Sequence, residues 1–404
     1  MVTFPQKFLW GAATSAYQVE GDNSRSDWWA WEKKIGLTGS GKACCHYQLF
    51  NEDFDLAKAL GHNCHRLSIE WSRVEPEEGK FCEAEIDHYR NVIAALKKRG
   101  IEPIVTLHHF TNPIWFAGRG DWQSKDATQF FLRYAEKVIS ALAGEVRFWV
   151  TINEPTVHVY YSYIFGSWPP GVKSIFKAWG VMKKLLSAHV KAYRLIHKIY
   201  RVRGLTRPMV GFAHNMQDYV SCKNNLKNRM AVHIRNKMFN LDIIHSLLTK
   251  KALDFIGVNY YSRSLVELKK FGIKNLIVDV CESGHSTLRK NSMGWDIYPE
   301  GLKHILLSLK IFKLPILILE NGICTQDDDL RWEFIKNHLL QIHEAISQGA
   351  NVIGYIYWSL LDNFEWDKGF IPRFGLVEVD YSNYQRKIRE SAKRFSEVCK
   401  TNLL

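Results

Sequence analysis

Eight segments of the chain have the hydrophobic pattern of β-strands, and most are separated by segments in which apolar residues recur at helical spacing. The clearest is Pro315–Gly322, where four aliphatic residues lie between a proline and a carboxylate. So short an apolar run is typical of a strand that is buried on both faces of a parallel sheet. The eight predicted strands are Phe8–Gln18, Asn63–Trp71, Glu102–Phe110, Val146–Pro155, Pro208–Asn215, Leu253–Tyr261, Pro315–Gly322 and Val352–Leu360.

Helical patterns fill much of the chain between these strands. They cover residues 51–60, 83–99, 125–142, 178–199 and 384–399. Alternation of strands and helices predicts a parallel sheet, and eight strands predict a closed (β/α)8 TIM barrel. Because no low-complexity linker divides the chain, we expect residues 1–404 to form a single domain. Two stretches, 217–237 and 262–293, are predicted to be irregular, apart from β-like pieces near Leu265 and Ile277.

Two of the predicted strands end in a carboxylate. Glu320 follows the aliphatic run after Pro315, and Glu154 follows the β-rich run that begins at Val146. Active sites of parallel barrels lie at the carboxyl ends of the strands. For Glu320 taken alone, a solvated carboxylate at the start of a loop is the alternative. Two such carboxylates on one chain favour glycoside hydrolysis, which uses one as nucleophile and the other as acid and base.

The composition supports a large folded chain. Hydrophobic residues make up 46% of it, and its 14 Trp, 17 Tyr and 22 Phe supply a core and also aromatic faces for a sugar-binding cleft. The N-terminus lacks a charged start followed by an apolar region, and no apolar run approaches the ~18 residues of a membrane span. We therefore expect a cytoplasmic protein without membrane insertion.

The eight cysteines are scattered and do not form a pattern typical of small secreted folds. We expect reduced thiols, most of them buried. The alternative is a metal site with ligands from two short segments, Cys44-Cys45-His46 and His62-Asn63-Cys64-His65. Neither piece has a standard zinc-ligand spacing, so ordinary packed residues are the favoured interpretation and no metal site is predicted.

The formal net charge of +13 is unevenly distributed. Residues 155–217 contain no acidic residue, and much of their positive charge lies on the predicted helix at 178–199. The favoured interpretation is a helix that packs on the core and exposes a basic face. Attraction to an anionic surface or to nucleic acid is the alternative. No nucleic-acid-binding motif accompanies the charge, so no specific nucleic-acid partner is predicted.

Two pentapeptides carry a resemblance to a known family. Thr-Ile-Asn-Glu-Pro at 151–155 and Ile-Leu-Glu-Asn-Gly at 318–322 resemble the signature motifs of glycoside hydrolase family 1, the β-glucosidase family. The resemblance extends from Phe4 to the last predicted helix. It implies that Glu320 attacks the anomeric carbon and that Glu154 acts first as acid and then as base. Retention of configuration implies carboxyl groups roughly 5 Å apart. Glu154 would then have a raised pKa, while Glu320 would be ionised beside Arg66.

The resemblance also assigns residues to the sugar. Asn153 would bind the 2-hydroxyl, and Tyr261 would orient the nucleophile. Adjacent strand residues point to opposite faces, so only one of His108 and His109 can face the barrel axis, and the family motif selects His109. The remaining substrate-binding residues implied by the resemblance are Gln18, Glu365, Trp358 and Trp366 around the nonreducing sugar and Trp295 on the aglycone side.

The implied activity is hydrolysis of β-glucosides, and also of β-galactosides or β-fucosides, with transglycosylation when an alcohol outcompetes water. The substrates would be small β-glycosides or oligosaccharides, and no cofactor is required. One alternative is a catalytically weak sugar-binding protein on the same fold. Another is a 6-phospho-β-glycosidase, which the carboxylate of Glu365 disfavours. The chain resembles a shortened family member between 215 and 252, which predicts a thinner wall and a more open aglycone side.

Overall fold

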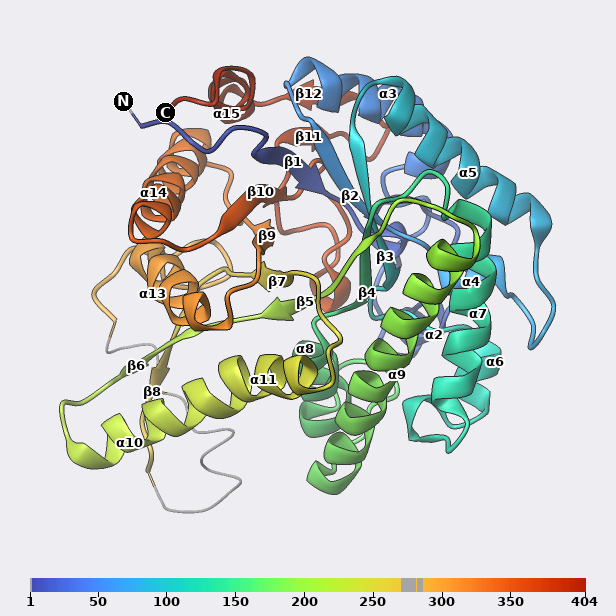
Figure 1. The fold of residues 1–404 in the computed structure, drawn as a ribbon, viewed down its shortest axis with the longest axis horizontal. Coiled ribbons are helices and arrows are strands. Elements are labelled where there is room, and N and C mark those ends of the chain that lie inside the picture. The colour runs from blue at the N-terminus through green and yellow to red at the C-terminus, as the bar shows by residue number, and fades with distance from the viewer. Residues whose placement is uncertain (1, 270–280, 282–285) are drawn as a thin grey trace.

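A closed barrel of eight parallel strands forms the centre of the computed structural model, which describes residues 2–269, 281 and 286–404 (Figure 1). Around the barrel the strands follow the order β1-β10-β9-β7-β5-β4-β3-β2. The barrel strands are β1 (Leu9–Ala13), β2 (Cys64–Ser68), β3 (Glu102–His108), β4 (Phe148–Asn153), β5 (Met209–Asn215), β7 (Ile256–Asn259), β9 (Ile316–Asn321) and β10 (Val352–Trp358). Each lies within one predicted strand, so the predicted (β/α)8 TIM barrel is confirmed.

Helices surround the barrel. The longer ones are α2 (Asp27–Lys34), α3 (His46–Ala59), α5 (Glu83–Lys98), α7 (Ala127–Leu142), α9 (Ile175–Val202), α10 (Leu226–Arg235), α11 (Asp242–Thr249), α13 (Pro299–Leu309), α14 (Asp328–Ser347) and α15 (Glu390–Thr401). The side chain of Ser174 caps α9 by accepting from the Lys177 amide, and Asp327 caps α14 at the Leu330 amide. Within the described ranges, none of the helices has the length and apolarity needed to cross a bilayer.

Alternation along the strands separates two cores. On β9, Ile316 and Ile318 belong to the large cluster between barrel and helices, whereas Leu317 and Leu319 belong to the cluster inside the barrel. This is the period of two expected for a strand covered on both faces. The apolar runs that identified the strands are therefore a consequence of burial on both sides.

Two predicted boundaries need correction. The first strand ends at Ala13, and Gln18 lies on the helical turn α1 (Ala16–Val19) rather than at the strand end. The last helix begins at Glu390, because Arg386–Ile388 forms strand β12, which pairs antiparallel with β11 (Val377–Val379). In both places a short strand is followed closely by a helical segment, and neither glycine nor proline marks the boundary between them.

Residues 217–237, predicted to be irregular, form regular elements in the structure. β6 (Asp218–Ser221) pairs in parallel with β8 (Arg263–Val266), and α10 continues through a π-helical turn, η3 (Asn236–Leu241), into α11. Ile244 and Leu247 of α11 are fully buried in the main core. The expected thinning of the barrel wall is therefore wrong at α11. The predicted β-like piece near Leu265 corresponds to β8, whereas the piece near Ile277 lies outside the described residues.

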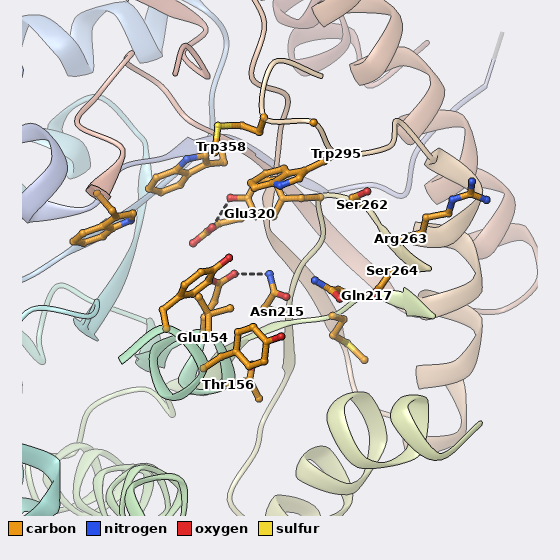
Figure 2. A pocket seen from close by; sticks show the side chains of 18 of the residues that line it. Glu154, Thr156, Asn215, Gln217, Ser262, Arg263, Ser264, Trp295, Glu320 and Trp358 are labelled. Carbon is orange, nitrogen blue, oxygen red and sulfur yellow. Dashed lines mark hydrogen bonds between the residues drawn. The ribbon is translucent and has the colours of Figure 1, made fainter. Parts of the chain in front are cut away.

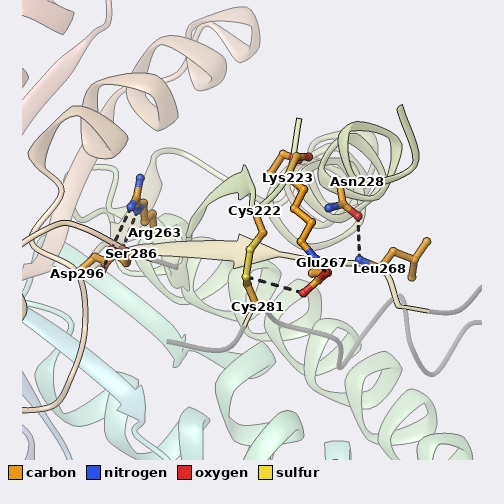
Figure 3. Close-up of a disulfide and its surroundings, with 10 residues drawn as sticks. Cys222, Lys223, Asn228, Arg263, Glu267, Leu268, Cys281, Ser286 and Asp296 are labelled. Atoms are coloured by element: carbon orange, nitrogen blue, oxygen red, sulfur yellow. Dashed lines mark hydrogen bonds and ion pairs between the residues drawn. A yellow bond between two sulfur atoms is a disulfide. The ribbon is translucent and has the colours of Figure 1, made fainter. Parts of the chain in front are cut away.

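A disulfide joins Cys222, which follows β6, to Cys281 (Figure 3). The expectation of reduced thiols is wrong for this pair, which is separated by 59 residues and therefore leaves no local signal in the sequence. The other six cysteines are free. Within the described residues, the one group of three side chains with metal-ligand geometry is this pair with Glu267. Because the two sulfurs are bonded to each other, neither is available as a thiolate ligand.

Candidate active site

A pocket of about 540 Å³ opens where the barrel strands end. It brings together side chains from loops and strands that are far apart in the sequence (Figure 2). The predicted site residues that line it are Gln18, His109, Asn153, Glu154, Tyr261, Trp295, Glu320, Trp358, Glu365 and Trp366. Arg66 is the one predicted residue outside the lining. It is 1% exposed and reaches the pocket through its contacts with Glu320 and Asn153.

Irregularities in the strands direct both glutamates into the pocket. Simple alternation after Ile316 and Ile318 would turn Glu320 toward the helices. Instead, the register between β7 and β9 shifts between Ile318 and Glu320. The register between β4 and β5 also shifts, between Val150 and Asn153, just before Glu154. Such bulges re-aim side chains, and here each precedes a carboxylate.

Glu320 is buried between two donors. An Nη of Arg66 lies 2.5 Å from its Oε1, and the hydroxyl of Tyr261 donates to its Oε2 at 2.6 Å. Burial, followed by the charge of Glu320, raises the pKa of Tyr261 well above its ordinary value, so the phenol remains a donor. The guanidinium also donates to Asn153 Oδ1 at 2.6 Å. The negative charge at Glu320 is thus compensated by a cation that cannot lose its proton.

Glu154 has a different environment. Its backbone adopts a left-handed conformation at φ 41°, which is strained for a non-glycine residue, and Pro155 then begins helix α8 (Pro155–Val159). Burial, and then the charge of Glu320, raises its pKa to about 8. The side-chain amides of Asn215 and Asn259 oppose this shift by donating to Oε1 at 3.1 and 2.8 Å. At neutral pH the carboxyl group is therefore mostly protonated.

Asn215 and Asn259 were not predicted as site residues. Asn215 ends β5 and Asn259 ends β7, and these two strands lie between β4 and β9 in the barrel. The position of an amide at the carboxyl end of a barrel strand is the signal that could have identified them. The two asparagines thus lie between the strands that carry Glu154 and Glu320. Figure 2 shows Asn215 beside Glu154.

Hydrogen bonds hold Gln18 at the end of the pocket near Glu365. The Gln18 amide donates to Asn363 Oδ1 at 3.0 Å and to Glu365 Oε2 at 3.2 Å, and its oxygen accepts from Ser15 at 2.7 Å. Burial, and then the charge of Glu320, raises the pKa of Glu365 to about 8. This end of the pocket therefore offers a fixed amide and a carboxyl group that can donate or accept.

Aromatic rings form one wall beside these polar groups. The His109 ring stacks with Trp358 at 5.9 Å and with Trp366 at 6.1 Å between ring centroids. Its Nε2 lies 3.2 Å from the Asn153 amide, and burial followed by the charge of Arg66 lowers its pKa well below the ordinary value. The ring is thus neutral, whereas His108 faces away and contacts Asn112. Apolar faces beside buried polar groups suit a sugar, which has both kinds of surface.

The glycine of the second motif has a packing role. A Cβ on Gly322 would lie 1.9 Å from the carbonyl oxygen of Trp358, so any side chain here would displace the end of β10 or of β9. The chain after β9 and the end of β10 are therefore held at a close approach that only glycine permits. The Glu-Asn-Gly sequence thus positions both a carboxylate and an aromatic wall of the pocket.

Comparisons with known proteins place the chain in a family. The model of "Glycosyl hydrolase family 1" matches residues 1–250 and 242–404. The chain is 31% identical to "Beta-glucosidase A" of Thermotoga maritima over 99% of this chain and 98% of that protein. Its structure resembles a β-glycosidase from Pyrococcus horikoshii, with a TM-score of 0.92 and 39% identity over 100% of this chain and 96% of the other.

A T. maritima β-glucosidase in complex with glucoimidazole is also similar, with a TM-score of 0.92 and 30% identity over the full length of both chains. The chain belongs to glycosyl hydrolase family 1 and is a glycosidase.

Proposed function

We propose that this glycosidase is a retaining β-glycosidase that acts on the nonreducing terminal sugar. The observation that carries the proposal is the contrast between its two carboxyl groups. Glu154 has a pKa raised to about 8, whereas Glu320 lies against the permanent charge of Arg66. Opposed environments of this kind separate a proton donor from a nucleophile. The separation of roughly 5 Å between the carboxyl groups stays a prediction.

The reaction follows from these two states. A Glu320 oxygen attacks the anomeric carbon while the Glu154 proton passes to the glycosidic oxygen, so the bond to the aglycone breaks as an ester bond to Glu320 forms. Glu154, now ionised, then takes a proton from water. The water oxygen attacks the anomeric carbon and releases Glu320 as a carboxylate. An alcohol in place of water would give transglycosylation. All proton and covalent steps are assigned to side chains of this chain.

The surrounding residues are proposed to position the sugar. Asn153, held by Arg66 and facing His109, would bind the 2-hydroxyl. Gln18 and Glu365 would bind the hydroxyls at the far end of the ring, where an unmatched buried polar group would penalise a wrong sugar. The apolar faces of the sugar would pack on Trp358 and Trp366, and Trp295 would line the aglycone side.

β-Glucosides are the proposed preferred substrates, with β-galactosides and β-fucosides also accepted. The names of the relatives support a glucosidase, and a carboxyl group at Glu365 suits a hydroxyl better than a phosphate, which binds cations. This argues against a 6-phospho-β-glycosidase. Both glutamates are present, which argues against an idle sugar-binding protein. We also propose that the chain acts as one barrel domain. A cytoplasmic location stays a prediction, and the disulfide is unusual for a reducing compartment.

The test is an assay of the purified protein with p-nitrophenyl β-glucoside, β-galactoside, β-fucoside and 6-phospho-β-glucoside. We expect the glucoside to give the highest kcat/KM and the 6-phosphoglucoside the lowest. Glu320→Gln should lower kcat by roughly 10⁴-fold or more, because the nucleophile is lost. Glu397→Gln, on the exposed face of α15, is the matched control and should leave kcat unchanged.

Two results would contradict the proposal. One is an α-configured first product in a nuclear magnetic resonance time course, since retention requires the β-anomer. The other is full activity of Glu320→Gln. A 2-deoxy-2-fluoro-β-glucoside with a good leaving group should add its sugar covalently to the peptide that contains Glu320, and mass spectrometry would detect it.

A further inference from the structure

Large apolar side chains are exposed beside the pocket, on the first turns of α9 and on the π-helical turn η2 (Tyr160–Phe165). Phe176 is 88% exposed and Trp179 is 63% exposed, which are extreme values for such side chains. We call the exposed apolar side chains of this surface the apolar rim. Its members are Tyr161, Phe165, Ile175, Phe176 and Trp179.

The fold places the apolar rim at the catalytic face. α9 follows β4 and η2, so it begins at the end of the barrel where Glu154 lies and runs back along the outside. Its 28 residues span about 42 Å, roughly twice the length of β4, and its N-terminal end lies at the edge of the molecule in Figure 1. The amides of Val172 and Ser174 donate to the carbonyls of Ser162 and Tyr163 at 3.0 and 2.8 Å, which holds the start of α9 against η2.

Positive charges surround the apolar rim. Lys173, Lys177 and Lys183 are exposed. The ammonium of Lys183 lies 5.0 Å from the centroid of the Trp179 ring. No acidic residue occurs in residues 155–217. A surface with aromatic and aliphatic anchors beside lysines is complementary to the interface of an anionic bilayer.

The apolar rim continues into the pocket. The Phe165 ring contacts the rings of Tyr160 and Tyr161 at 4.5 and 6.3 Å between centroids, and both tyrosines line the pocket. Other apolar residues of the lining are Met216, Tyr219, Phe239 and Leu265. Polar side chains, among them Gln217, Ser262 and Arg263, lie in the same lining. An aglycone with both a polar linker and a fatty chain therefore matches this side of the pocket.

We propose that the apolar rim docks on an anionic lipid bilayer and that the enzyme removes sugars from glycosides whose aglycone is a membrane lipid. The docking is a property of the surface alone. The substrate class rests on the proposed glycosidase function. Nucleic acid is a poorer occupant, because it would satisfy the lysines but leave Ile175 and Phe176 without apolar partners. The rim lies on a bilayer and does not span it.

Sedimentation with vesicles tests the docking without any catalysis. The protein should sediment with vesicles of equal parts phosphatidylcholine and phosphatidylglycerol at low salt, and not with phosphatidylcholine alone. Phe176→Ser combined with Trp179→Ser should weaken binding by at least roughly tenfold, since two large apolar anchors are lost. Lys177→Gln and Lys183→Gln should each weaken it roughly fivefold and reduce its salt dependence.

Val202→Ser is the matched control for the apolar changes. Val202 is 74% exposed and lies on the same helix, but at its opposite end, so its removal should leave vesicle binding unchanged. The proposal would be overturned if the parent protein did not sediment with anionic vesicles at low salt, or if the Phe176/Trp179 double variant sedimented as well as the parent. It would also be overturned if the parent did not bind vesicles but formed a dimer, and the double variant were a monomer. The last result would identify a second copy as the occupant.

Kinetics then test the lipid aglycone. With p-nitrophenyl β-glucoside, the double variant should retain the parent kcat/KM, because neither changed residue lines the pocket. With a β-glucosylated diacylglycerol in the anionic vesicles, its kcat/KM should fall roughly tenfold. Equal kcat/KM values on the vesicle substrate would refute the role of the surface in substrate delivery. If the parent protein hydrolysed neither substrate, the proposed function would be refuted, whereas the sedimentation result would still stand.

Discussion

Arg66 joins Glu320 to Asn153 through a single guanidinium. One Nη lies 2.5 Å from Glu320 Oε1 and the other 2.6 Å from Asn153 Oδ1. The proposed nucleophile and the proposed partner of the 2-hydroxyl are thus held by one planar, permanently charged group. A lysine offers a point charge on a flexible stem and cannot reproduce this fork.

Arg66→Lys should lower kcat by roughly 100-fold while keeping the positive charge, because one of two charge-assisted hydrogen bonds is lost. Steady-state kinetics with p-nitrophenyl β-glucoside would measure it. Arg331→Lys is the control, since Arg331 is equally buried but donates to backbone carbonyls, including that of Ile323 at 3.0 Å. Among the described residues, it forms no hydrogen bond or ion pair with Glu320 or Asn153. It should lower the melting temperature with little change in kcat. Unchanged kcat in Arg66→Lys would contradict the bridging role.

Tyr261→Phe removes the second donor to Glu320. The 2.6 Å bond to Oε2 is made to a charged group, so its loss should lower kcat by roughly 10–100-fold. Tyr260→Phe is a neighbouring control, because the Tyr260 hydroxyl donates to the Tyr298 carbonyl outside the pocket. If both variants lost the same activity, the effect would come from packing rather than from the bond to Glu320.

Glu154→Gln should discriminate among leaving groups. A 2,4-dinitrophenyl glucoside needs little protonation on departure, so its glycosylation step should be nearly preserved, whereas an alkyl glucoside should lose activity by roughly 10²–10⁴-fold. Rapid-quench kinetics would separate this step from release of the sugar. Azide should accelerate that release, because an anion needs no general base. If the glycosylation rate fell by the same factor with both glucosides, Glu154 would not be the acid.

The raised pKa of Glu154 also determines a pH limit. The acid form exists below about pH 8, so kcat/KM should fall about tenfold per pH unit above that value. Glu365 titrates in the same range, since burial and Glu320 raise its pKa to about 8 as well. Glu365→Gln should therefore lower kcat/KM at every pH but keep its fall at alkaline pH. Glu154→Gln should abolish this alkaline fall. If kcat/KM of the Glu154→Gln variant still fell at alkaline pH, that fall would belong to another titrating group.

The cysteine pairing can be counted directly. A thiol reagent should detect six thiols in protein denatured without reductant and eight after reduction, because Cys222 and Cys281 are joined. Protein purified under oxidising conditions is the appropriate material. A count of eight without reductant would show that the pair is reduced in solution.

Much of the barrel follows from the sequence because strands buried on both faces are short apolar runs with clear ends. Glu154 and Glu320 were identifiable because each follows such a run. The bulges before them were not, because a register shift depends on the neighbouring strand. Asn215 and Asn259 were missed for a related reason, since an amide at a strand end acquires its partner only when the barrel closes.

Other errors came from elements that are stabilised by distant contacts. The helix around Ala231 has only a narrow apolar stripe, which packs against Val266 and Leu268 beyond the next barrel strand. Its polar composition therefore resembled a loop. The sequence predicts Gln18 at a strand end because the strand pattern runs into a helical turn, and the Gln18 side chain is held by Asn363, more than 300 positions away.

The interval between β4 and β9 has an implication for engineering. Two hydrogen-bonded strands, β5 and β7, occupy it, so the spacing of the proposed acid and nucleophile is a property of the scaffold and not of the surface loops. Loops grafted onto the rim of this barrel should thus alter which molecules enter while leaving the intrinsic rate of sugar transfer largely intact.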